Sequence, residues 1–210
     1  MASLFPHSVA AAESAFGDQD VGVWAEEAPA VMHAVPKRRR EFAAGRLCAR
    51  AALVQLGHAP VAIARDADRA PVWPQGLVGS ITHCEGFAAA AVASASDYRT
   101  LGIDVEHDGA VPLSVASALL TPEEVDHMAA LPSACRDWRT LFFSAKEAVY
   151  KALFPLTREF LDAHAVRIQV DPDGQRFEAR ILAGTMRSVR VPGRYALRQF
   201  RIHTASWLLR

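Results

Sequence analysis

The stretch FFSAKEAVYKA, residues 142–152, combines the apolar spacing of a buried helix with three charged side chains. On an α-helix Glu147 and Lys151 lie one turn apart on the same face. One interpretation is a surface ion pair at positions i and i+4, which stabilises a helix by only about 0.2–0.5 kcal/mol. The other is that the pair belongs to a binding or catalytic site. The surrounding sequence decides between the two.

The helix predicted over residues 135–154, which we expect to end before Pro155, carries one polar stripe. Thr140, Ser144, Glu147 and Lys151 recur at intervals of three or four residues, and most other positions are apolar. A polar stripe on an otherwise apolar helix either faces water or lines a site.

The segment LGIDVEH, residues 101–107, predicts a strand in which Asp104 and Glu106 share one face. Two adjacent carboxylates repel each other unless a positive charge lies between them, and Mg²⁺ takes carboxylate oxygens while keeping sites for phosphates. The alternative is the solvated end of a strand. If the polar stripe of the helix faces this strand, Glu147 adds a third oxygen ligand and Lys151 reaches a phosphate on the same metal.

The segment KRRREFAAGRLCAR, residues 37–50, places six basic residues at the start of a helix predicted from Pro36 to Gly57. Helix N-termini and guanidinium groups both favour phosphate. Arg38 and Arg46 are eight residues apart and can share a face. The alternative is a solvated basic face. Nucleic-acid binding is disfavoured, because the chain has equal numbers of acidic and basic residues and no exposed aromatic residues beside this run.

The segment VGSITHCEG, residues 78–86, predicts a polar loop before a strand. Ser80 or Thr82, together with His83, can contact a phosphorylated ligand, although a lone histidine in a loop is more often structural. The sequence contains no GxSxG elbow, P-loop or GxGxxG motif.

The remaining pattern predicts an α+β fold of helices and antiparallel strands, with two similar subdomains as one possibility. Thr121 begins a helix with a capping box, and Gly174 supplies a positive φ in a hairpin turn. The predicted strands lie around residues 21–24, shortly after residue 58, at 87–94 and 100–106, and in two C-terminal pairs on either side of DPDG and after Pro192-Gly193.

Composition indicates a soluble cytoplasmic protein. The 210 residues include 23 acidic and 23 basic side chains, so no net charge attracts nucleic acid or an anionic membrane. The three cysteines are far apart and match no zinc or disulfide pattern. The N-terminus lacks a signal peptide, and no apolar run approaches the ~18 residues of a membrane span.

Five segments occur in a characteristic order: RRREFAAGRLCAR, APVWP, GSITHC, GIDVE and FSAKEAVYKA. Over residues 37–160 this order resembles the 4'-phosphopantetheinyl transferases that serve siderophore, nonribosomal peptide and polyketide synthases, above all the enterobactin-synthetase-type branch. The resemblance implies a monomer of two similar α+β subdomains related by a pseudo-twofold axis. Residues 1–103 would carry the basic helix and the coenzyme A phosphate loop, and residues 104–210 the metal-binding strand and the KExxxK helix.

The resemblance also implies an activity: Mg²⁺-dependent transfer of the 4'-phosphopantetheine arm of coenzyme A to a serine of an apo acyl, peptidyl or aryl carrier protein. Asp104, Glu106 and Glu147 would hold Mg²⁺. Glu147, or a metal-bound water that it orients, would act as base, with Lys151 and Asp104 as further catalytic residues. The implied coenzyme A contacts are Arg38, Arg46, Arg65, Arg69, Thr82, His83, Asp104, Glu147 and Lys151.

Two other functions remain open at this stage. Another Mg²⁺-dependent phosphoryl-transfer enzyme or phosphohydrolase would release phosphate without a protein acceptor. A nucleic-acid-binding module would bind DNA or RNA in a salt-sensitive way and need no Mg²⁺.

Overall fold

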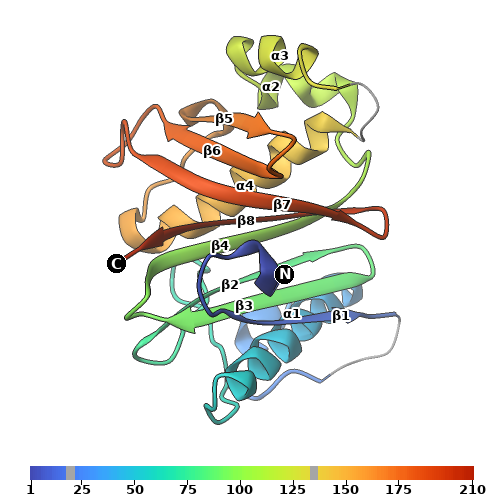
Figure 1. The fold of residues 1–210 in the computed structure, drawn as a ribbon. Coiled ribbons are helices and arrows are strands. Elements are labelled where there is room, and N and C mark those ends of the chain that lie inside the picture. The colour runs from blue at the N-terminus through green and yellow to red at the C-terminus, as the bar shows by residue number, and fades with distance from the viewer. Residues whose placement is uncertain (18–21, 133–136) are drawn as a thin grey trace.

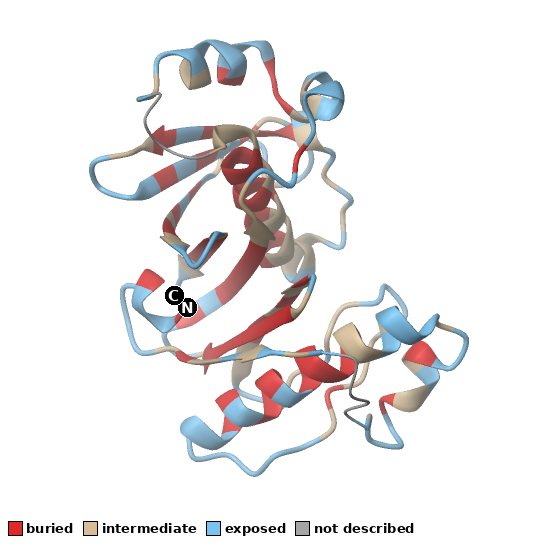
Figure 2. Ribbon diagram, turned by 90° about the vertical axis from the view of Figure 1, so that its right-hand side faces the viewer, coloured by how far each residue is buried: buried red, intermediate tan, exposed pale blue. Residues whose placement is uncertain are grey.

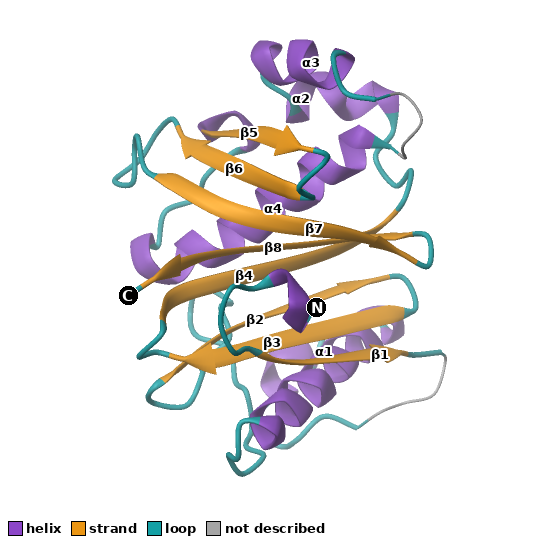
Figure 3. Cartoon of the chain, in the orientation of Figure 1, coloured by secondary structure: helices purple, strands orange, loops and turns teal. Residues whose placement is uncertain are grey.

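The computed structural model describes residues 1–17, 22–132 and 137–210 and has an α+β fold with two antiparallel sheets. The fold class predicted from sequence is confirmed. Figures 1 and 3 show helix α1 behind the three-stranded sheet and helix α4 behind the five-stranded one. The three-stranded sheet has the order β1 (Ala10–Ala15), β3 (Phe87–Ser94), β2 (Leu77–Cys84). The five-stranded sheet has the order β4 (Tyr98–His107), β8 (Arg201–Leu209), β7 (Arg190–Arg198), β6 (Arg176–Ile181), β5 (Val166–Asp171).

Within the described ranges, two long helices and two short ones accompany the sheets. The α-helices are α1 (Pro36–Gln55), α2 (Ala116–Leu119), α3 (Pro122–Ala129) and α4 (Trp138–Thr157). Single 3₁₀ turns occur at η1 (Ala2–Leu4), η2 (Ala28–Val31), η3 (Leu113–Val115) and η4 (Ala163–Ala165). No helix of the described ranges is long and apolar enough to cross a bilayer.

Strand β3 separates two parts of the hydrophobic core. Its sequence FAAAAVAS is buried except at the last residue. Because alternate side chains of a strand point to opposite faces, Ala89 and Ala91 pack with the N-terminal residues while Ala90 and Val92 pack with α1. Small side chains on both faces let these layers approach closely. Figure 2 shows buried residues along this strand and along the helices that cover the sheets.

Gly102 allows strand β4 to lie directly against helix α4. A Cβ atom at this position would stand 2.0 Å from the carbonyl oxygen of Ala148 and 2.5 Å from the amide nitrogen of Ala152. Only glycine fits this approach. The contact sets Asp104, two residues further along β4, beside Lys151 of α4.

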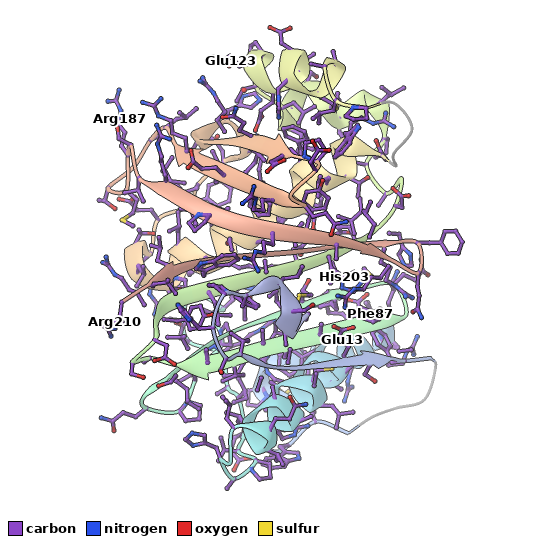
Figure 4. The ribbon with its side chains drawn as sticks, viewed as in Figure 1. Glu13, Phe87, Glu123, Arg187, His203 and Arg210 are labelled. Atoms are coloured by element: carbon purple, nitrogen blue, oxygen red, sulfur yellow. The ribbon has the colours of Figure 1, made fainter. Side chains whose placement is uncertain are left out.

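The two sheets also meet through side chains. His203 of β8 packs edge-on against Phe87 of β3, with 5.6 Å between ring centroids. Figure 4 labels both residues, close to each other where the two sheets meet. The expected boundary between residues 103 and 104 falls inside β4. The division into two halves stays a prediction.

Several predicted elements are confirmed. Helix α1 begins at Pro36, and Gly57 follows its end with a φ of 78°. Strand β3 covers the predicted residues, and the capping box of Thr121 and Glu124 is present at α3. Both C-terminal strand pairs are formed.

Other predictions are wrong. The segment containing Thr82 and His83 is strand β2 and not a loop. Residues 22–24 form no strand, and Val21 lies outside the described residues. The strand expected after residue 58 is only an isolated bridge between Arg65 and Pro71.

Two local details also differ from the predictions. Helix α4 continues through Pro155 to Thr157, because a proline in the last turn removes only one hydrogen bond and Arg158 then ends the helix with a φ of 57°. In the hairpin turn the positive φ lies at Gln175 (48°) and not at Gly174. The predicted helix start at Cys135 lies outside the described residues.

Candidate active site

A cleft of about 780 Å³ is lined by residues of α1, β2, β4 and α4 and of the connection between α1 and β2. Every site residue predicted from the sequence lines this cleft. These residues are Arg38, Arg46, Arg65, Arg69, Thr82, His83, Asp104, Glu106, Glu147 and Lys151. The structure therefore brings together residues that lie more than 100 positions apart. Their individual roles stay predictions.

Hydroxyl groups of β2 fix the position of β4. The backbone N–H of Ile103 donates to Ser80 Oγ at 3.1 Å, and that of Val105 donates to Thr82 Oγ1 at 3.3 Å. Buried N–H groups need acceptors, and on this edge of β4 side chains supply them in place of a neighbouring strand. Ser80 and Thr82 are two residues apart and therefore lie on the same face of β2. Predicting a strand at this position would have revealed that shared face.

The side chain of Asp104 is almost fully buried, and only one of its two carboxylate oxygens has hydrogen-bond partners among the described residues. Its Oδ1 accepts hydrogen bonds from Lys151 Nζ at 2.6 Å and from Thr82 Oγ1 at 3.0 Å. Its Oδ2 is buried and has no hydrogen-bond partner among the described residues. A buried carboxylate oxygen without a partner is costly unless a ligand or ion completes it.

Glu106 and Glu147 add two further carboxylates to this side of the cleft. Burial and the neighbouring Asp104 raise the pKa of Glu106 to about 7. Burial, and to a lesser extent Asp104, also raises the pKa of Glu147, against the lowering effect of Lys151. Asp104 therefore disfavours the charged forms of both glutamates, and an additional cation would relieve this repulsion.

As placed, no three His, Cys, Asp or Glu side chains of the described ranges form a group that could hold a metal ion. The three-carboxylate magnesium site stays a prediction. The unpartnered Oδ2 of Asp104 and the repulsion among the three acids fit a divalent cation, because Mg²⁺ is commonly bound through one or two carboxylates plus substrate phosphates.

The polar stripe of α4 has two distinct parts. Ser144 is buried and hydrogen-bonds Thr204 of β8 at 2.9 Å, and Thr140 Oγ1 accepts the backbone N–H of Val111 at 3.2 Å. Glu147 and Lys151, one and two turns further on, line the cleft. The stripe thus serves packing in its first half and the cleft in its second.

Arg38, Glu41 and His83 form a cluster between α1 and β2. Arg38 Nη1 hydrogen-bonds His83 Nε2, and Arg38 also donates to Glu41 Oε2 at 3.3 Å. Burial, and next the charge of Arg38, lowers the pKa of His83 to about 4, so the ring is neutral at pH 7. Because arginine only donates, Nε2 accepts and Nδ1 carries the proton, 3.7 Å from Glu41 Oε2. Glu41, one turn beyond Arg38, was not predicted.

Arg46 and Arg65 lie over the ring of Phe42. Their guanidinium carbons are 4.2 and 4.9 Å from the ring centroid. Arg46 Nε donates to the carbonyl oxygen of Ile63 at 2.6 Å, whereas its Nη2 is buried and has no partner within the described chain. Burial, and secondly Arg65, lowers the pKa of Arg46 to about 10, so it stays charged at neutral pH. Converging cations with an unused donor favour an anionic ligand.

Family models match most of the chain. A model of the 4'-phosphopantetheinyl transferase N-terminal domain matches residues 26–93, and a model of the 4'-phosphopantetheinyl transferase superfamily matches residues 100–202. Together they include every residue predicted for the site.

Curated relatives agree with these models. The chain is 46% identical to the 4'-phosphopantetheinyl transferase Svp of Streptomyces mobaraensis, over 87% of this chain and 76% of that protein. It is 43% identical to the 4'-phosphopantetheinyl transferase PptT of Mycobacterium tuberculosis, over 75% and 71%. Enterobactin synthase component D of Escherichia coli K12 is 37% identical over 65% of each chain. The chain therefore belongs to the 4'-phosphopantetheinyl transferase superfamily.

Proposed function

We propose that this protein transfers the 4'-phosphopantetheine arm of coenzyme A to a serine of an apo carrier protein and releases adenosine 3',5'-bisphosphate. The observation that carries the proposal is that one cleft has an arginine side, around Phe42, and a carboxylate side, around Asp104. Coenzyme A bears a 3'-phosphate and a diphosphate, which need cationic partners at two separate places.

The arginine side suits the nucleotide end of coenzyme A. Arg38 and Arg46 would bind the 3'-phosphate, and Arg46 Nη2 is a buried donor without a partner among the described residues. His83 of β2 hydrogen-bonds Arg38, and its neighbour Thr82 contacts Asp104 and Lys151, so β2 links the two sides. Arg65 and Arg69 belong to the connection between α1 and β2 and line the same cleft.

The carboxylate side suits the reacting diphosphate. Asp104, Glu106 and Glu147 would hold Mg²⁺, which when bound would offset the charge of the diphosphate. Glu147, or a metal-bound water that it orients, would take the proton of the carrier serine. The serine oxygen then bonds to the β-phosphorus, and the bond from that phosphorus to the leaving nucleotide phosphate breaks. Lys151 would offset the charge of the leaving phosphate.

The acceptors would be acyl or peptidyl carrier proteins of polyketide, nonribosomal peptide or siderophore synthases. The names of the relatives support this choice, because one of them is an enterobactin synthase component. The proposal includes a monomer that acts in the cytoplasm and binds neither nucleic acid nor membrane.

The test is to incubate the protein with coenzyme A, Mg²⁺ and a panel of apo carrier domains and to weigh the carriers by mass spectrometry. We expect at least one carrier to gain the phosphopantetheine arm, with no gain when EDTA replaces Mg²⁺. Hydrolysis of coenzyme A or other phosphate esters at the same rate without any carrier would instead indicate a phosphohydrolase. Loading that is unaffected by EDTA would contradict the metal assignment.

A further inference from the structure

An ion pair ties the end of helix α4 to the connection between α1 and β2. Arg158 Nη1 lies 2.5 Å from Asp66 Oδ2 and 3.4 Å from Asp68 Oδ2. The two partners are 92 positions apart in the sequence. Arg158 has a left-handed backbone and is the residue that ends α4, so its position is set by the helix that carries Glu147 and Lys151.

The other end of this tie is a compact loop, residues 65–71, which we call the arginine loop. Asp66 Oδ1 accepts the backbone N–H of Asp68 at 3.0 Å and of Ala70 at 2.8 Å, and a bridge between Arg65 and Pro71 closes the loop. These bonds make the loop one unit. A contact that fixes the position of Asp66 therefore also fixes the rest of the loop, including the two arginines that line the cleft.

Electrostatic repulsion works against the position of the arginine loop. Burial, followed by the charges of Arg38 and Arg69, lowers the pKa of Arg65. Arg65 in turn is the leading charge that lowers the pKa of Arg46. Arg38 and Arg46 of α1 thus repel Arg65 of the loop, which disfavours this position of the loop when no anionic ligand is present. The attachment of Asp66 to Arg158 opposes this repulsion.

We propose that Arg158 is a positioning residue for coenzyme A: through Asp66 and Asp68 it holds the arginine loop over the cleft, so that Arg65 and Arg69 are in place before the nucleotide binds. The inference rests on the proposed function, since it takes the nucleotide end of coenzyme A as the ligand of these arginines. Preorganisation of this kind increases affinity because less ordering remains to be done on binding.

The first measurement is the affinity for adenosine 3',5'-bisphosphate by isothermal titration calorimetry. We expect Arg158→Ala to weaken binding about 3- to 5-fold, the range of a good exposed ion pair. In carrier loading, KM for coenzyme A should rise by the same factor, while kcat at saturating coenzyme A and KM for the carrier stay near their wild-type values.

Asp66→Asn distinguishes positioning from direct contact. The asparagine keeps the Oδ1 that accepts from Asp68 and Ala70, but it replaces the Oδ2 that faces Arg158 with an amide that cannot accept. If the tie positions the loop, Asp66→Asn weakens binding by at most the factor seen for Arg158→Ala, because the 3.4 Å contact with Asp68 remains, and the double variant is no weaker than Arg158→Ala alone. If Arg158 instead touches the ligand, Asp66→Asn leaves affinity unchanged or improves it, and the proposal is overturned.

Arg167→Ala is the matched control, because Arg167 also forms an exposed ion pair, 2.5 Å from Glu123, that does not line the cleft. It should leave affinity and KM unchanged. Equal affinity of wild type and Arg158→Ala would refute the positioning role of Arg158 but not the proposed function. Failure of the wild-type protein to bind adenosine 3',5'-bisphosphate or to load any carrier would instead refute the proposed function.

Discussion

Helix α4 carries two lysines five residues apart, and they differ in whether the carboxylate that each one contacts is fully hydrogen-bonded. Lys146 lies in the packed region between α4, α3 and η4, where its Nζ donates to Glu124 Oε2, to the carbonyl of Leu119 and to the carbonyl of Ala163, at 2.6–2.8 Å. Lys151 faces the cleft, where its Nζ donates to Asp104 Oδ1 at 2.6 Å and more weakly to Thr82 at 3.3 Å.

The acidic partners show the same difference. Glu124 uses both oxygens: Oε2 accepts from Lys146 and the backbone N–H of Thr121, and Oε1 accepts from the N–H of Ile168. Asp104 leaves Oδ2 buried without a partner among the described residues. A fully satisfied buried ion pair serves the fold, whereas a half-satisfied one is suited to a ligand. The predictions below test this distinction.

The largest effect is expected at the cleft. Glu147→Gln keeps the shape of the side chain but removes the base and a negative charge, so turnover of carrier loading should fall by about 10²- to 10⁴-fold. The melting temperature should change little, because the glutamine fits the same space. Carrier loading at the wild-type rate would contradict the assignment of Glu147.

The next largest effect is expected at the packed pair. Lys146→Met leaves the carboxylate of Glu124 buried without its cation, and the free energy of unfolding should fall by about 3–5 kcal/mol. Urea denaturation followed by circular dichroism measures this change. Turnover per folded molecule should stay close to that of the wild type at low temperature.

Lys151→Met is the matched variant for that experiment. It should lower the free energy of unfolding by about 1–3 kcal/mol, less than Lys146→Met, because Asp104 is buried but the lysine itself reaches cleft water, while carrier loading falls strongly. If Lys151→Met costs as much stability as Lys146→Met and leaves loading intact, the distinction between the two lysines is wrong.

A smaller effect is expected where β4 meets α4. Gly102→Ala places a methyl group 2.0 Å from the carbonyl oxygen of Ala148, so β4 and α4 must separate. Overpacking of this kind costs about 1–3 kcal/mol of unfolding free energy. Because the same contact sets Asp104 beside Lys151, turnover should also fall. A variant with reduced stability and unchanged turnover would show that the cleft tolerates the shift.

The smallest effect is expected at the cap of α3. Thr121→Ala removes the hydroxyl that accepts the N–H of Glu124, and the free energy of unfolding should fall by about 1 kcal/mol. Carrier loading should not change, since Thr121 lies outside the cleft. A loss of turnover would mean that α3 contributes to the cleft after all.

The residues that line the cleft were predicted from the sequence more accurately than the strands and helices that carry them. Charged residues at strand and helix spacing identified Asp104, Glu147 and Lys151, because those side chains stand out against apolar neighbours. The same polarity caused the error at β2, where Ser80, Thr82 and His83 resemble a loop. The hydroxyls of Ser80 and Thr82 are tolerated in this strand because they accept backbone N–H groups on the free edge of β4.

Other features depend on contacts that no local pattern reveals. Strand β1 consists mainly of alanines and carries little strand preference of its own, so its formation depends on pairing with β3. The role of Lys146 depends on Glu124, which reaches it only after α3 folds back onto α4. The tie from Arg158 to the arginine loop spans 92 positions. Each requires the tertiary structure.

The most direct test of the central claim is a crystal structure with coenzyme A and Mn²⁺, in which anomalous scattering locates the metal. The account predicts an ion in contact with Asp104 Oδ2 and with the diphosphate, with Glu106 and Glu147 turned toward it. Coenzyme A bound in the cleft with no ion at Asp104, and with only Lys151 beside that carboxylate, would contradict it.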